Sequence, residues 1–206
     1  MTQPQQIKKG YVRGVRGAVI TPIKPDGDDD PEAVSYGIKT AQQIGVNLVV
    51  EAGNAATLRG GDQILAYVKD PDTVVAANLT VQNARFDAAA MEVLAGGTLI
   101  TETVESEEVI TGWEAPSIEE QQNPPQFKLE IYAANHNKRG GLDGFVKYTF
   151  FYGCSHFGNE TLQDQNWVIP EMNIECFENP SKATGGVYRK EFVPVLPAEL
   201  SPAEPA

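Results

Sequence analysis

The stretch LTVQNARFDAAAMEVLAGG, residues 79–97, decides the fold because two hydrophobic periodicities meet in it. Its first four residues alternate between apolar and polar side chains, which is typical of a strand with one solvated face. Apolar residues then recur at helical spacing, at positions 86, 89, 90, 93 and 94. We therefore expect a strand that leads into one helix at about residues 85–95, with Phe86 buried.

The same stretch contains signals for both ends of the helix. Asn83 belongs to a residue type that caps helix N-termini through its side-chain oxygen. Gly96 and Gly97 supply the positive φ with which helices commonly end. We expect Asn83 to be the N-cap and the helix to stop before Gly96.

The rest of the chain has the patterns of strands and loops, apart from weak helical character at 32–44. Alternating or apolar segments occur at 11–23, 46–50, 64–68, 73–82, 98–103, 109–113, 127–134, 145–152, 168–176 and 187–195. Strands and helices do not alternate along the chain, which excludes a parallel α/β sheet. The sequence predicts a mainly β protein, a β-sandwich or barrel with one flanking helix and long hairpin loops.

One hairpin is expected at residues 46–69. The apolar positions of 46–50 match those of 64–68, and the connection 53–62 contains Arg59, Gly60 and Gly61. A glycine-rich loop suggests phosphate binding, but neither GxGxxG nor GxxxxGK[ST] is present. The better interpretation is a mobile connection that either contacts a neighbouring subunit or is simply flexible.

Composition limits the domain organisation and the partners. A chain of 206 residues, 41% of them hydrophobic, suits a single domain at 1–196 with an N-terminal arm at 1–10 and a flexible tail at 197–206. No apolar run is long enough for a membrane anchor or a signal peptide, so we expect synthesis in a cytosol. The net charge of -12 argues against a protein that binds nucleic acid tightly.

The potential metal ligands do not form a recognisable site. Cys154 and Cys176 are expected to be buried and reduced, although a disulfide remains possible if their strands are neighbours. A zinc site combining them with His136 and His156 lacks the usual close ligand pairs. The acidic stretch 25–31 lacks EF-hand spacing and is interpreted as a solvated turn. We expect no metal and no cofactor.

The sequence also lacks a recognisable catalytic motif. No serine or cysteine stands in a nucleophile-elbow sequence, and no carboxylate pair is distinguished from surface charge. We expect that the chain is not an enzyme. The classes left open are a structural subunit, a β-sandwich binding module and, least favoured, an acid–base hydrolase.

The order of these parts resembles the major tail tube proteins of long-tailed bacteriophages, a family related to the tube proteins of contractile tails and of type VI secretion. The resemblance covers about residues 12–196. It rests on the strand and helix at 79–97, the preceding hairpin 46–69, and the segments FVKYTFFYGC (145–154), VIPEMNIECFENPS (168–181) and GVYRKEFVPVL (186–196).

The resemblance implies a structural virion protein of the tail, made in the bacterial host cytoplasm. Six-fold rings of such subunits stack into a hollow tube that conducts DNA during ejection without binding it specifically. Each subunit contributes two hairpins to an inner barrel. Here these would be 46–69 and the pair 127–134 with 145–152, and the helix would lie near a ring neighbour. Tape measure, tail terminator and baseplate proteins would be further partners.

Two sets of candidate residues follow from this resemblance. The subunit-interface candidates are Arg59, Gly60, Gly61 and Glu92. The candidates for a DNA-conducting lumen are Glu51, Asp62, Asp70 and Glu130. A lumen lined by carboxylates would repel the phosphates of DNA.

The alternative is a β-sandwich binding module, such as a carbohydrate-recognition or virion-decoration domain. Such modules usually have aromatic side chains beside a shallow site. Trp113 and Trp167, the only tryptophans, are far apart in the sequence, so they neither support nor exclude this alternative.

Overall fold

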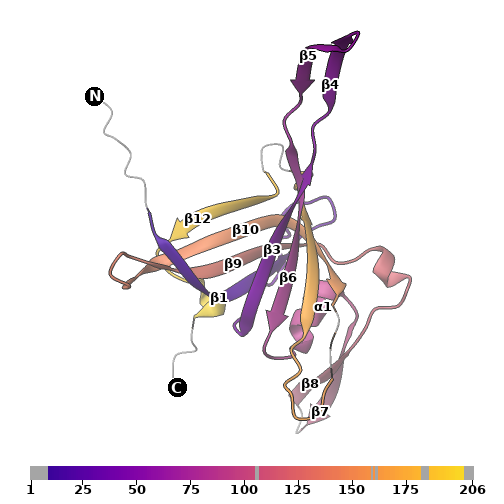
Figure 1. Cartoon of the computed structure of the whole chain (residues 1–206). Coiled ribbons are helices and arrows are strands. Elements are labelled where there is room, and N and C mark those ends of the chain that lie inside the picture. The colour runs from indigo at the N-terminus through magenta and orange to yellow at the C-terminus, as the bar shows by residue number, and fades with distance from the viewer. Residues whose placement is uncertain (1–8, 105–106, 159, 161, 182–185, 202–206) are drawn as a thin grey trace.

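The structure, a computed structural model, describes residues 9–104, 107–158, 160, 162–181 and 186–201. The described residues form twelve strands, one α-helix and two short 3-10 helices (Figure 1). The strands are β1 (Tyr11–Pro22), β2 (Tyr36–Ile38), β3 (Ala41–Glu51), β4 (Ala55–Gly60), β5 (Gln63–Lys69), β6 (Thr73–Asn83), β7 (Thr98–Val104), β8 (Glu107–Glu114), β9 (Phe127–His136), β10 (Leu142–Phe157), β11 (Glu171–Phe177) and β12 (Tyr188–Val193). The helices are α1 (Ala88–Ala95), η1 (Glu120–Gln122) and η2 (Ala198–Leu200). The mainly β class with a single α-helix is confirmed.

Eight strands form one antiparallel sheet, in the order β2-β1-β9-β10-β11-β6-β3 with β12 also paired to β10. β10 is the central strand of this sheet. Its residues Phe145–Phe150 pair with β12 and its residues Tyr152–Phe157 pair with β11, while β9 occupies the other edge. Aromatic residues on both faces of β10 are explained by this central position.

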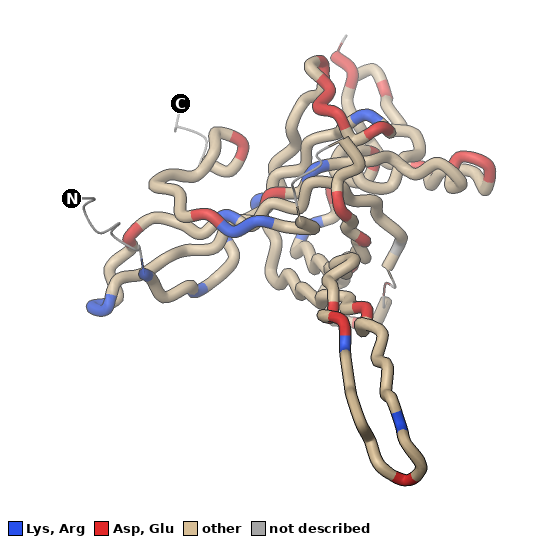
Figure 2. Tube along the Cα trace, turned by 90° about the horizontal axis from the view of Figure 1, so that it is seen from above, with Lys and Arg blue, Asp and Glu red and all other residues tan. Residues whose placement is uncertain are grey.

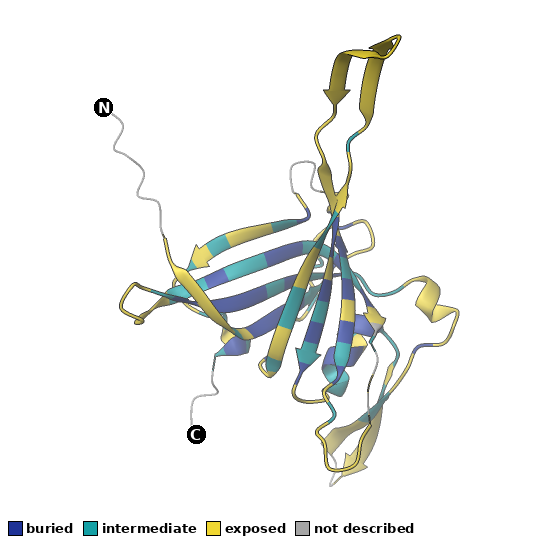
Figure 3. Cartoon of the chain, viewed as in Figure 1, coloured by how far each residue is buried: buried dark blue, intermediate teal, exposed yellow. Residues whose placement is uncertain are grey.

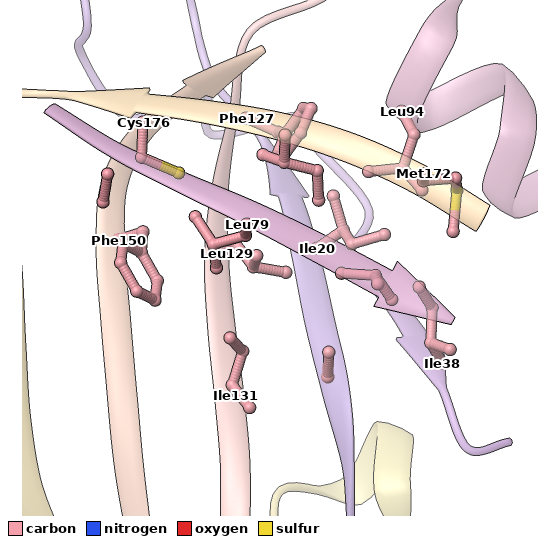
Figure 4. Packing of buried hydrophobic residues seen from close by; sticks show 14 of the residues in the cluster. Ile20, Ile38, Leu79, Leu94, Phe127, Leu129, Ile131, Phe150, Met172 and Cys176 are labelled. Carbon is pink, nitrogen blue, oxygen red and sulfur yellow. The ribbon is translucent and has the colours of Figure 1, made fainter. Parts of the chain in front are cut away.

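The core lies where the sheet bends over itself. In Figure 4, β6 crosses over β1, β9 and β10, and apolar side chains from both layers meet between them. Ile20, Leu129 and Phe150 come from one layer, and Leu79 and Ile174 come from the other. Each is at most 1% exposed, and burying such a side chain stabilises the fold by about 1.5–3 kcal/mol. The eight-stranded sheet therefore folds into a β-sandwich, because two of its parts pack face to face across this core.

Helix α1 begins two residues later than its apolar stripe predicted. Asp87 is the N-cap and accepts a hydrogen bond from the Ala90 amide at 3.4 Å, while Gly96, with φ of 75°, ends the helix as expected. The prediction of Asn83 as the cap was wrong, because its amide is buried and donates to the Arg85 carbonyl. Phe86 precedes the helix and is 50% exposed, so its predicted burial was also wrong.

Four further predictions differ from the structure. Residues 32–44, expected to be weakly helical, contain β2 and the start of β3. β3 pairs with β6 rather than with 64–68, and 53–62 is not a loop, because it contains β4 and the turn to β5. In the predicted tail, η2 packs Leu200 into a small buried cluster, whereas 202–206 and arm residues 1–8 lie outside the described residues.

The β4–β5 ribbon projects from the body of the molecule in two perpendicular views (Figure 1 and Figure 2). The β7–β8 ribbon forms a second separate two-stranded sheet beside α1. Figure 3 shows that both ribbons are mostly exposed, while the eight-stranded sheet alternates between buried and exposed positions. Within the described part of the chain, no helix is long and apolar enough to cross a membrane.

Candidate assembly surfaces

The β4–β5 ribbon has one face made entirely of apolar side chains. Cross-strand pairs place Ala56 opposite Val68 and Leu58 opposite Ala66 on this face. The opposite face is mixed, with Thr57 paired to Tyr67 and Ala55 paired to Lys69. We call the first surface, Ala56, Leu58, Ala66 and Val68, the apolar hairpin face.

This face is uncovered in the single chain. Leu58 and Val68 are 61% and 63% exposed. An isolated two-stranded hairpin is at best marginally stable in water, and clustered exposed apolar side chains mark interaction sites. The apolar hairpin face is therefore a candidate surface for a partner.

The ribbon is anchored at its base by polar contacts. The Asp70 amide donates to the Asn54 carbonyl at 2.9 Å, and the Gly53 amide donates to Asp72 Oδ1 at 2.9 Å. Lys69 Nζ lies 2.9 Å from the same oxygen, and it lowers the pKa of the Asp72 carboxyl, as does the Gly53 amide. A side chain at Gly53 would meet the Asp70 carbonyl, since a Cβ there would lie 2.0 Å from that oxygen. The base holds the two strands together where they leave the sheet.

The outer edge of β3 is a second surface that lacks protection. β3 ends the strand order of the sheet, and residues 41–50 contain no charged side chain. Val46 and Val50 are 44% and 55% exposed. Edge strands normally carry charges that discourage pairing with other chains, and β12, with Arg189 and Lys190, fits that rule. β3 carries a single charge, Glu51 at its end, so little in its sequence discourages pairing with another chain, although β1 lies near it in the fold.

The predicted interface residues separate into two places. Arg59 and Gly60 lie at the end of β4, and Gly61, with φ of 63°, forms the turn that follows. Glu92 lies apart from them on the exposed side of α1, whose buried residues include Leu94. The structure does not bring the tip of the ribbon and the helix together.

The predicted lumen residues are also dispersed. Glu51 and Asp70 are exposed at the base of the ribbon, and Asp62 is exposed in the turn at its tip. Glu130 lies on β9 in the body, where its carboxylate is 3.2 Å from Lys147 Nζ and accepts a hydrogen bond from the Tyr132 hydroxyl. The charge of Glu130 is therefore compensated by Lys147, a contact between two strands that the sequence alone could not predict.

The second hairpin assigned to a shared barrel, 127–134 with 145–152, cannot serve that purpose. These residues lie in β9 and β10, and both edges of each strand are occupied by neighbours in the same chain. The β7–β8 ribbon is the other pair of strands outside the main sheet. Its two segments were expected as strands, but their separation from the sheet carried no signal in the sequence.

The cysteines and histidines do not converge. Residues 153 and 176 are paired across β10 and β11, as are Cys154 and Glu175, so the two thiols point to opposite faces of the sheet. Both are free, and burial raises the pKa of each thiol. His136 lies at the far end of β9, away from Cys176 and His156.

Comparisons with known proteins give matches among solved structures only. No family model and no curated protein matches the chain. Among solved structures, a chain of the "Cryo-EM structure of the anti-feeding prophage (AFP) baseplate, 6-fold symmetrised" is 8% identical, with a TM-score of 0.36 over 95% of this chain and 100% of that chain. A match at this level carries no inference about function.

Proposed function

We propose that this chain is a structural subunit of a bacteriophage tail tube. Copies of the chain would form six-fold rings, and the rings would stack into a hollow tube through which DNA passes. The order of sequence elements at 12–196 supports this proposal. The structural observation that carries it is the apolar hairpin face, which a solitary subunit leaves in water.

Assembly into rings accounts for both unprotected surfaces at once. Closing strands from several chains into one barrel removes exposed sheet edges such as that of β3, whose single charge is Glu51. A long ribbon reaches beyond its own subunit and can cover its apolar face against a neighbour. Repeating the same contacts by rotation produces a closed ring of identical subunits.

The acidic composition fits a conduit for DNA. The chain has a net charge of -12, and Glu51, Asp62 and Asp70 are exposed carboxylates along the ribbon. Placed on the wall of a bore, they would repel DNA phosphates and keep the duplex from adhering. In this proposal the protein acts as a passive channel rather than as an enzyme, and it resides in the virion tail after synthesis in the host cytoplasm.

Electron microscopy tests this proposal directly. The purified chain, concentrated stepwise and examined in negative stain, is expected to form rings and hollow tubes. Discrete monomers at every concentration would favour the alternative, a β-sandwich binding module. The Glu92→Lys variant tests the helix within the same experiment: its monomer should fold normally, and normal tubes from it would remove Glu92 from the interface.

A further inference from the structure

Opposite ends of the β1–β9 ladder carry opposite charge. Tyr11 pairs with His136 at one end, and Pro22 pairs with Phe127 at the other. Because β9 spans ten residues, these ends lie about 30 Å apart. Figure 2 shows blue positions near the start of β1 and red positions concentrated across the molecule from it.

The basic end is a rigid turn, residues 137–141, between β9 and β10. Asn137 braces it, because its Oδ1 accepts hydrogen bonds from the Arg139 and Gly141 amides at 2.9 and 3.1 Å. Lys138 and Arg139 at its tip are exposed and have no ion-pair partner among the described residues. The turn presents two free cations in a fixed place.

The opposite end contains a groove of about 460 Å³. It lies between the end of β1 and the segment after η1, and its lining residues include Pro22, Pro25, Pro124, Gln126 and Tyr152. Gln126 Oε1 is a buried acceptor without a hydrogen-bond partner among the described residues. The segments beside the groove, 22–32 and 117–126, contain seven carboxylates and a single base, Lys24.

The two ends are chemically complementary. A guanidinium stacks well on an aromatic ring such as that of Tyr152, which lines the groove. The surrounding carboxylates attract the cations. The turn cannot reach the groove of its own chain, since the ladder holds the two apart.

We propose that the 137–141 turn of one copy docks in this groove of a second copy, in a head-to-tail contact. Such a contact joins two different surfaces, so it propagates from subunit to subunit and closes a ring or extends a stack. This inference rests on the proposed function, to which it adds a specific contact between neighbours. Asp28 and Glu119 are the groove-side carboxylates best placed for a test, because they are exposed and their side chains make no hydrogen bond or ion pair within the described residues.

Two variants with reversed charge test the contact. The turn variant carries Lys138→Glu and Arg139→Glu, and the groove variant carries Asp28→Lys and Glu119→Lys. Each alone should self-associate about tenfold more weakly than the wild type in sedimentation velocity. An equimolar mixture should recover the association, because the acidic turn of one variant meets the lysines of the other. A control variant, Glu102→Lys with Asp164→Lys, makes the same charge change away from the groove and should behave like the wild type.

The outcomes separate this contact from the tube itself. Tubes that the turn variant forms as readily as the wild type would overturn the head-to-tail contact and leave the tube intact. Failure of the mixture to recover association, with both variants folded by circular dichroism, would also overturn it. Wild-type oligomers that are lost in the turn variant and recovered in the mixture, yet never become hollow, would support the contact and refute the tube.

Discussion

At the scale of single residues, Asp87 connects the helix to the edge of the sheet. One carboxylate oxygen accepts from the Ala90 amide and caps α1, while the other accepts a hydrogen bond from the Tyr36 hydroxyl on β2. Burial and this carboxylate raise the pKa of Tyr36 above its ordinary value of about 10. The protonated phenol is thus favoured by the folded state.

This arrangement predicts a loss of stability in alkaline solution. Because the folded chain holds the Tyr36 proton more tightly than the unfolded chain does, the stabilisation is fully present below about pH 10 and is lost as the pH rises toward the folded-state pKa. Tyr36→Phe should therefore flatten the decrease in the free energy of unfolding above pH 10, measured by urea titration. Tyr67→Phe, on the exposed β4–β5 ribbon, is the control, and equal flattening by both would contradict the assignment.

Leu94 and Phe86 provide a second residue-scale prediction, since they lie on the same predicted stripe but differ in burial. Leu94 is fully buried and Phe86 is 50% exposed. Leu94→Ala should lower the free energy of unfolding by about 2–5 kcal/mol through loss of burial and the cavity it leaves. Phe86→Asp should leave a folded protein and cost about 1 kcal/mol or less. Thermal unfolding measures both, and a Phe86→Asp chain that fails to fold would contradict the observed exposure.

At the scale of elements, the two-faced β4–β5 ribbon separates folding from assembly. Leu58→Asp places a charge on the apolar hairpin face, whereas Thr57→Asp, one residue earlier, places it on the mixed face. Because all residues of this ribbon are exposed, neither change should alter monomer stability by more than about 0.5 kcal/mol.

The expected result is that Leu58→Asp abolishes tubes while Thr57→Asp impairs them less, as judged by negative-stain microscopy and sedimentation. The physical reason is that a buried, unpaired carboxylate at an apolar interface is strongly unfavourable. If the Leu58 variant formed normal tubes, the apolar hairpin face would not be an assembly surface.

At the scale of the whole molecule, the sign of the charge should govern how an assembled tube treats DNA. A Glu51→Lys, Asp70→Lys variant keeps the fold, because both side chains are exposed and make no ion pair among the described residues. Its tubes should retain double-stranded DNA at low salt and release it as salt rises, since lysines bind phosphates with counterion release. Wild-type tubes should retain none, as measured by cosedimentation.

The matched control for this experiment is again the Glu102→Lys, Asp164→Lys variant, which has the same net charge but alters positions away from the base of the ribbon. Equal DNA retention by the control would show that net charge, rather than a lumen at Glu51 and Asp70, determines the behaviour.

The sequence by itself determined the class of the fold and most of its strands. Period-2 alternation placed β6, β9 and β11, and the change of period at residues 83–86 marked the only α-helix of the described chain. Gly96 fixed the end of that helix, because a positive φ there is a local property of the backbone. These features follow from neighbouring residues alone, so no knowledge of the rest of the chain was needed.

Only the tertiary structure decided which strands pair and which surfaces remain uncovered. The apolar positions of β3 suit β5 and β6 equally well, since alternation specifies the face of a strand but not its partner. For the same reason, the sequence could not predict that the β4–β5 ribbon projects from the body, that Lys147 compensates the charge of Glu130, or that Phe86 is exposed. The stretch 79–97 thus predicted a strand and a helix from local patterns. Long-range packing determined that Leu94 enters the core while Phe86 stays at the surface. The same packing left the apolar hairpin face exposed, where a partner can cover it.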